Sequence, residues 1–102
     1  MIQRLVLVKL NDEWATSEGR TTVAEYSRAL LNGLPRVKQA QVGIPADAPS
    51  TQSWDVSFSL TFDSMEDIAP YIVEATHRDF VDNYLSPKAV VKKAWNFDVG
   101  NG

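Results

Sequence analysis

The stretch Trp54-Asp55-Val56-Ser57-Phe58-Ser59-Leu60-Thr61-Phe62 decides how this chain folds. Large apolar side chains alternate with small or acidic polar ones, and a period of two is typical of a strand with one buried face. The alternation places Trp54, Val56, Phe58, Leu60 and Phe62 on one face, and Asp55, Ser57, Ser59 and Thr61 on the other. The apolar face predicts that helices cover one side of a sheet.

The segments on either side supply the rest of that sheet. Residues 2–10 are rich in aliphatic side chains and predict a strand buried on both faces. Residues 36–43 and 89–99 predict two further strands, and the chain end at residues 101–102 a frayed tail. Residues 44–53 carry two prolines among small polar residues, which predicts a loop.

A first helix lies between the strands at 2–10 and 36–43. Apolar residues three or four positions apart mark its buried stripe: Val23, Tyr26, Leu30, Leu31 and Leu34. Thr22 with Glu25 can form a capping box, or Thr16 can begin the helix earlier, although Gly19 would weaken that turn. Gly33 and Pro35 end it.

A second helical region follows the central strand and is expected to be broken in two. Starting a helix at Asp67 places Pro70 in its first turn, where no backbone bond is lost, and this helix runs to about Glu74. Thr76 caps a second short helix before Pro87. Its inner face is formed by Phe80, Val81, Tyr84 and Leu85.

This order of elements, β-α-β-β-α-β, predicts an α+β protomer of the ferredoxin-like type, a four-stranded antiparallel sheet with helices on one face. In so small a chain the other face would leave Leu5, Leu7 and their neighbours in water. We therefore expect a homodimer in which two open sheet faces meet.

Composition narrows the classes of function. The 102 residues predict a single domain over 1–102, and the net charge of −3 without a basic run argues against nucleic acid as a partner. No stretch reaches the length of a membrane span, and the absence of cysteine fits a cytoplasmic protein without disulfides or thiolate chemistry. No glycine-rich phosphate motif is present, and the acidic pairs lack clustered histidines, so we expect no cofactor and no metal site.

His77 is the only histidine, and Tyr71 precedes it by six residues. Histidine exchanges protons near neutral pH, so His77 could act as a general base while Tyr71 stabilises a developing enolate oxygen. A helix break at Ala75–Thr76 would bring the two rings together. The alternative is that His77 is a half-buried residue that bonds a backbone carbonyl, and that Tyr71 only packs in the core.

The chain resembles the stress-responsive dimeric α+β barrel (Dabb) domain family. The resemblance rests on Met1–Leu10, on Leu34-Pro35 closing the first helix, on Trp54–Phe62, and on Tyr71–His77 followed by Pro87. It implies a ferredoxin-like protomer and two sheets that close into one barrel. In one member, olivetolic acid cyclase, a tyrosine and a histidine six residues later line a pocket, and Tyr71 and His77 match that spacing.

Two positions depart from the family pattern. Arg4 stands where members often have a first-strand histidine, and the frequent His-Pro-x-His segment is Glu74-Ala75-Thr76-His77 here. Arg4 shares a strand face with residues expected beneath the helices, so its charge needs a partner, and the family layout implies Glu74. Arg4 either binds a carboxylate or enolate oxygen at a pocket mouth, or serves only as an ion-pair partner.

Three functions stay open at this point. The first is a barrel that binds a hydrophobic or aromatic molecule, with His77 as base and Tyr71 as acid if it is an enzyme acting on a polyketide- or phenol-like compound. Further side chains expected to wall its pocket, if they are not plain core, are Arg4, Tyr26, Phe58, Leu60, Glu74, Phe80 and Val81. The second is a structural, stress-associated barrel. The third is cofactor-free oxygenation, as in related antibiotic-biosynthesis monooxygenases, which rely on an electron-rich ring of the substrate. Trp54 or Trp95 would be the residues to consider for it, but nothing in the sequence places either in a pocket.

Overall fold

The computed structural model describes residues 1–100, so the frayed tail expected at Asn101 and Gly102 lies outside the described residues. The elements follow in the order β1 (Ile2–Leu10), α1 (Ser17–Asn32), β2 (Gln39–Gly43), α2 (Ala48–Ser53), β3 (Val56–Phe62), the 3-10 helix η1 (Met65–Asp67), α3 (Ile68–Val73), α4 (Ala75–Asp79), the π-helical segment η2 (Phe80–Leu85) and β4 (Ala89–Asp98). Within these residues no helix is long and apolar enough to cross a membrane.

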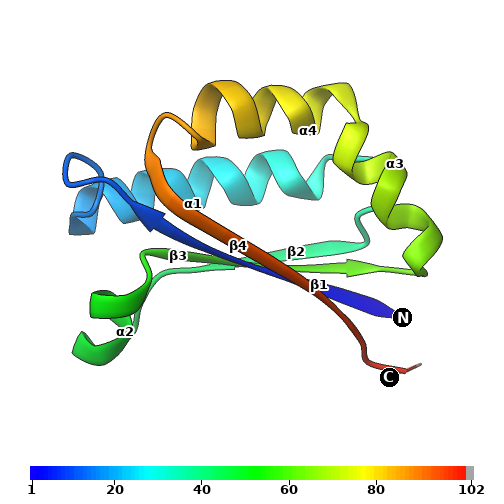
Figure 1. The fold of residues 1–102 in the computed structure, drawn as a ribbon, viewed down its shortest axis with the longest axis horizontal. Coiled ribbons are helices and arrows are strands. Elements are labelled where there is room, and N and C mark those ends of the chain that lie inside the picture. The colour runs from blue at the N-terminus through cyan, green and yellow to red at the C-terminus, as the bar shows by residue number, and fades with distance from the viewer. Residues whose placement is uncertain (101–102) are drawn as a thin grey trace.

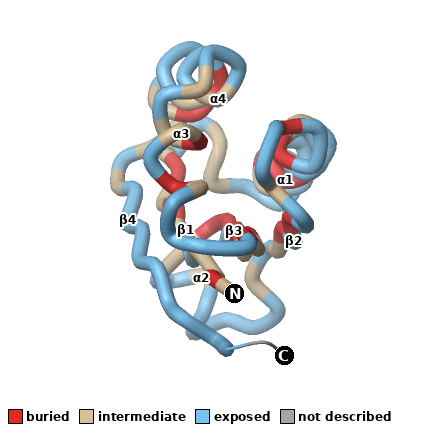
Figure 2. The backbone as a smooth tube through the Cα atoms, turned by 90° about the vertical axis from the view of Figure 1, so that its right-hand side faces the viewer, coloured by how far each residue is buried: buried red, intermediate tan, exposed pale blue. Residues whose placement is uncertain are grey.

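The four strands form one antiparallel sheet in the order β2-β3-β1-β4, which confirms the ferredoxin-like arrangement. Helices α1, α3 and α4 cover one side of the sheet, whereas α2 lies on the other side (Figure 1). The predicted alternation holds from Val56 onward, because Val56, Phe58, Leu60 and Phe62 are buried. Trp54, expected on the same face, instead caps the end of α2 and is not buried. The buried residues gather between the sheet and the covering helices (Figure 2).

The first helix begins at the earlier of the two expected positions. The Thr16 hydroxyl accepts a hydrogen bond from the Gly19 N–H at 2.9 Å, so Thr16 and not Thr22 is the N-cap. Gly19 does not weaken this turn but makes it possible, because a Cβ there would lie 2.1 Å from the Trp14 carbonyl oxygen. Gly33 ends the helix, as expected.

Two predicted boundaries are wrong for identifiable reasons. The second strand begins at Gln39 and not at residue 36, because Arg36 has a φ of +73°, which an extended strand cannot contain. The expected loop at residues 44–53 contains α2, since the Asp47 carboxylate caps it by accepting the Ser50 N–H at 2.9 Å. Hydrogen bonds from the side chain and the backbone N–H of Ser50 lower the pKa of Asp47.

Asp55 also departs from its expected place on the polar face. It precedes β3 and is only 1% exposed, and its two carboxylate oxygens accept from the Leu10 N–H at 2.7 Å and the Arg20 Nε at 2.9 Å. Asp55 therefore ties β1, α1 and the start of β3 together.

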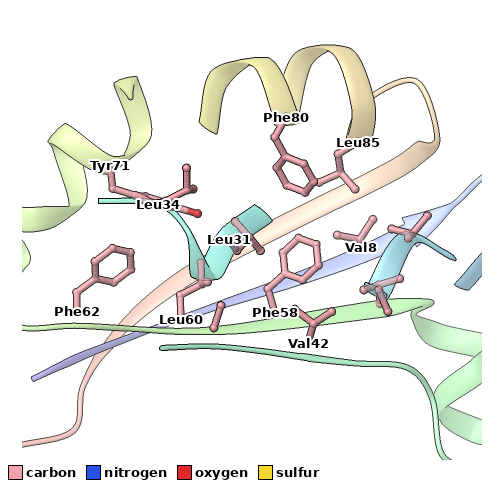
Figure 3. Packing of buried hydrophobic residues seen from close by; sticks show 14 of the residues in the cluster. Val8, Leu31, Leu34, Val42, Phe58, Leu60, Phe62, Tyr71, Phe80 and Leu85 are labelled. Carbon is pink, nitrogen blue, oxygen red and sulfur yellow. The ribbon is translucent and has the colours of Figure 1, made fainter. Parts of the chain in front are cut away.

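The second helical region is broken, as predicted, and Pro70 lies in the first turn of α3. The cap of α4 is Glu74 and not Thr76, because the Glu74 carboxylate accepts the His77 N–H at 2.9 Å. The chain then continues through the π-helical η2, which turns Phe80 and Leu85 into the core (Figure 3).

The outer face of the sheet carries exposed apolar side chains, as the sequence indicated. Leu5, Trp95 and Phe97 are 38%, 47% and 50% exposed, and Leu5 pairs directly with Trp95 across β1 and β4. A monomer would leave this patch in water.

Candidate functional site

A cavity of about 200 Å³ lies between the inner face of the sheet and the helices α3, α4 and η2. Six of the nine side chains singled out by the sequence line it: Arg4, Phe58, Tyr71, His77, Phe80 and Val81. Phe58 points from β3 toward Phe80 of η2, and Tyr71 reaches inward from α3 (Figure 3). The cavity is therefore a mostly apolar hollow whose lining includes a tyrosine, a histidine and an arginine.

The other three expected side chains do not line this cavity. Tyr26 is 46% exposed and stacks on Tyr84 with ring centroids 3.9 Å apart. Leu60 is fully buried in the core, and the Glu74 carboxylate is engaged as the cap of α4.

Tyr71 is almost completely buried. It is 3% exposed, and its ring meets the ring of Phe62 edge to face, with centroids 4.9 Å apart. Burial raises the pKa of Tyr71 to about 12, with a smaller opposing effect from the positive charge of Arg4. The phenol is therefore protonated at neutral pH and remains a hydrogen-bond donor.

His77 reaches Tyr71 because the chain breaks between α3 and α4. The break falls at Glu74, whose ψ of 134° is not helical, and not at Ala75–Thr76 as the sequence suggested. The two rings lie 4.2 Å apart, centroid to centroid, at 37°. The sequence-based expectation that a helix break brings them together is thus met, one residue earlier in the chain.

The imidazole of His77 has a defined hydrogen-bond partner in the Ile72 carbonyl oxygen, 3.2 Å from Nδ1. A carbonyl can only accept, so this contact assigns the proton of the neutral ring to Nδ1 and leaves the lone pair on Nε2. Burial lowers the pKa of His77; the Ile72 carbonyl opposes this effect, and the nearby Arg4 adds to it. His77 therefore meets the requirements of a neutral base.

Arg4 lies on the helix-facing side of β1, but its partner is not the expected Glu74. Its Nη1 donates to Oδ1 of Asn96 on the neighbouring strand at 3.0 Å, and the register places the two residues directly opposite each other. Among residues 1–100, no carboxylate lies within 4.0 Å of the Arg4 guanidinium. Arg4 lines the same cavity as Tyr71 and His77, and its positive charge opposes the rise in the pKa of Tyr71 and adds to the fall in the pKa of His77.

Four residues that line the cavity were not predicted from the sequence. Ile72, Arg78, Lys92 and Ala94 also line the cavity. Lys92 and Ala94 could have been found from β4, because they alternate with residues of the outer face in the same period of two that places Arg4 inward. Ile72 could not, since its contribution to His77 is a backbone carbonyl.

The tryptophans considered for oxygenation lie elsewhere. Trp95 is on the outer face of the sheet, and Trp54 lines a separate hollow of about 590 Å³ beside α2. In the described part of the chain, no three His, Asp or Glu side chains lie close enough to hold one metal ion.

These features define a ferredoxin-like α+β protein with a small, partly polar cavity beneath its second helical region. The chain belongs to the stress responsive A/B barrel domain (Dabb) family, whose model matches residues 2–99. This confirms the family resemblance read from the sequence. No protein with a curated description matches the chain.

Solved structures share this fold at low sequence identity. A protein from Arabidopsis thaliana is 18% identical with a TM-score of 0.80, covering 100% of this chain and 98% of its own. A hydroxynitrile lyase from Passiflora edulis is 15% identical with a TM-score of 0.74, covering 99% and 94%. A protein of unknown function from Thermobifida fusca, described as dimeric and ferredoxin-like, is 16% identical with a TM-score of 0.75, covering 96% and 90%.

Proposed function

We propose that this protein is a homodimer in which each protomer binds a small aromatic or hydrophobic molecule in the cavity beneath α3, α4 and η2. His77 acts there as a proton acceptor, and Tyr71 as a hydrogen-bond donor. The observation that carries the proposal is the Tyr71–His77 pair, with ring centroids 4.2 Å apart in the wall of an otherwise apolar cavity.

The protonation states support proton transfer. Because the pKa of Tyr71 is raised and that of His77 is lowered, both side chains are neutral near pH 7, one as a donor and the other as an acceptor. Nε2 of His77 would take a proton from an acidic C–H or O–H of the ligand. The Tyr71 hydroxyl would donate to the oxygen on which negative charge develops. No cofactor is needed for these steps.

The size of the cavity limits the ligand. Pockets for drug-sized ligands span roughly 300–1,000 Å³, and this one is smaller at about 200 Å³. A single ring with short substituents is the expected occupant, and a bicyclic one is not.

The dimer is supported by the apolar outer face of the sheet and by relatives of the same fold that are described as dimeric. Packing two such faces would remove Trp95, Phe97 and Leu5 from water and leave the two cavities on the outside of a closed barrel.

An enzymatic role of the lyase or cyclase type is the second candidate. The fixed tautomer of His77 favours it, because a half-buried histidine with a free Nε2 is suited to proton abstraction. The hydroxynitrile lyase of the same fold and the Tyr–His spacing attributed to olivetolic acid cyclase agree with this role. A monooxygenase role is less supported, since neither Trp54 nor Trp95 lines the cavity.

The test of this proposal follows His77, the single histidine, by NMR. We would follow the ring signals of His77 by NMR while adding phenol and phenylacetone to the intact protein, and then measure exchange of the phenylacetone α-protons in D₂O. Saturable shifts of the His77 signals and exchange that is lost in His77→Ala are expected.

Thr76→Ala is the matched control, because Thr76 is exposed on the same turn of α4 and does not line the cavity. Binding without exchange would leave the ligand-binding role and remove the enzymatic one. No shift of His77 with either compound would refute the proposal.

A further inference from the structure

The charged side chains described in the cavity lining are all cationic. Of the residues at 1–100, Arg4, Arg78 and Lys92 line it and no aspartate or glutamate does, although the chain as a whole carries a net charge of −3. An apolar cavity with only cationic charges in its wall favours an anionic occupant over a neutral one.

Within the described part of the chain, two of these cations lack a charged partner. Arg78 is neutralised by Asp82, whose Oδ1 lies 2.8 Å from its Nη2. Arg4 and Lys92, in contrast, donate only to the neutral Asn96 and Ser86, and among residues 1–100 neither is within 4.0 Å of a carboxylate. Arg4 is half-buried and has only a neutral partner among these residues, so its charge is available to an anion in the cavity.

The hydrogen bond to Asn96 also orients Arg4. Nη1 is the donor in that bond, and no protein acceptor among the described residues engages Nε or Nη2. The edge formed by Nε and Nη2 presents two parallel N–H groups, which match the two oxygens of a carboxylate.

We propose that the ligand of this cavity is a single-ring aromatic carboxylic acid, whose carboxylate is bound by the Arg4 guanidinium with Lys92 as a second cation and whose ring lies among Phe58, Phe80 and Val81. This inference rests on the proposed binding function and adds the charge of the ligand. A phosphate monoester shares the anionic chemistry, but it would bring a second charge and a larger desolvation cost into a wall made mostly of apolar side chains.

The test compares three probes of similar size, benzoate, uncharged benzamide and phenyl phosphate, by calorimetry on the intact protein. Benzoate is expected to bind at least about tenfold more tightly than benzamide, since hydrogen bonds to charged groups are the stronger ones. Arg4→Gln should weaken benzoate binding by about ten- to a hundredfold and benzamide binding by less than about threefold.

Three further variants separate the effect of charge from that of geometry and control for misfolding. Arg4→Lys keeps the charge but loses the paired donors, so benzoate affinity should fall to an intermediate value. Lys92→Gln changes an exposed side chain, which leaves the core intact, and should weaken benzoate binding but not benzamide binding. Lys38→Gln removes the same charge from an exposed ion pair with Asp63 outside the cavity and should change neither.

The outcomes distinguish the proposed carboxylate specificity from the proposed binding function on which it rests. Equal affinity for benzoate and benzamide, or an unchanged ratio in Arg4→Gln and Lys92→Gln, would overturn the carboxylate and leave the apolar cavity as a binding site. Tighter binding of phenyl phosphate than of benzoate would overturn the carboxylate in favour of a phosphate. If no probe binds, the binding function itself fails, and the inference fails with it.

Discussion

The imidazole of His77 lies against the phenol of Tyr71, with ring centroids 4.2 Å apart, although the two residues belong to different helices. The break at Glu74 makes this possible, because a continuous helix would place residues six positions apart on different faces. The pair shares one cavity wall with Arg4, so the properties of each group should respond to the others.

The protonation of His77 should reflect its burial. We expect its pKa to be below the ordinary value of 6.5, and Arg4→Gln to raise it, because the guanidinium disfavours the charged ring. NMR titration of the only histidine measures this directly, with Lys38→Gln as a control for net charge. An unshifted pKa in Arg4→Gln would contradict the proximity of Arg4.

The lowered pKa of His77 should make the free energy of unfolding depend on pH. Folding favours the neutral ring, so the contribution of His77 is fully present above pH 6.5 and is lost as the pH falls through its lower folded-state pKa. His77→Asn should flatten this part of the curve of unfolding free energy against pH. If the free energy of unfolding falls equally with decreasing pH in the variant and the wild type, groups other than His77 dominate this pH dependence.

Tyr71 should make the free energy of unfolding depend on pH in the alkaline range. Its pKa is raised from 10.0 to about 12, so its contribution to stability is complete below pH 10 and is lost as the pH rises toward 12. Between about pH 8 and about pH 11.5, the free energy of unfolding should fall by about 2 kcal/mol more in the wild type than in Tyr71→Phe. Denaturant titrations at both values measure the difference, and equal losses would contradict it.

The ion pair between Arg20 and Asp55 should be essential for stability. Asp55 is almost completely buried, so Asp55→Ala leaves Arg20 and the Leu10 N–H without their acceptor and should cost about 3–5 kcal/mol. Asp63→Ala, in the exposed pair with Lys38, is the matched control and should cost less than about 1 kcal/mol. A similar cost for both variants in chemical denaturation would show that the buried pair is dispensable.

The outer face of the sheet should hold the dimer together. Trp95→Lys places a charge in the middle of the apolar patch and should yield a folded monomer in sedimentation experiments at concentrations where the wild type is a dimer. Val73→Lys is the control, because Val73 is also an exposed apolar side chain, at 71%, but it lies on α3 at the helix side. A wild type that sediments as a monomer would refute the dimer itself.

Patterns along the chain were sufficient to predict most of the fold. The alternation of residues 56–62, the apolar stripe of α1 and the break before His77 are local signals, so the antiparallel four-stranded sheet with its covering helices could be expected before any coordinates. The errors concern features that the residue pattern does not record. Arg36 adopts a positive φ, and Gly19 is required because a Cβ there would lie 2.1 Å from the Trp14 carbonyl oxygen.

The sequence by itself determined which groups can perform chemistry here, a single histidine, a tyrosine six residues before it and a cation on the inner face of the first strand. Only the tertiary structure decided their partners: Ile72 for the His77 ring, Asn96 for Arg4, and Leu10 with Arg20 for Asp55. The physical reason is that periodicity fixes the face on which a side chain lies, whereas the partner of a polar atom depends on strand register and helix packing, which join residues far apart in the chain.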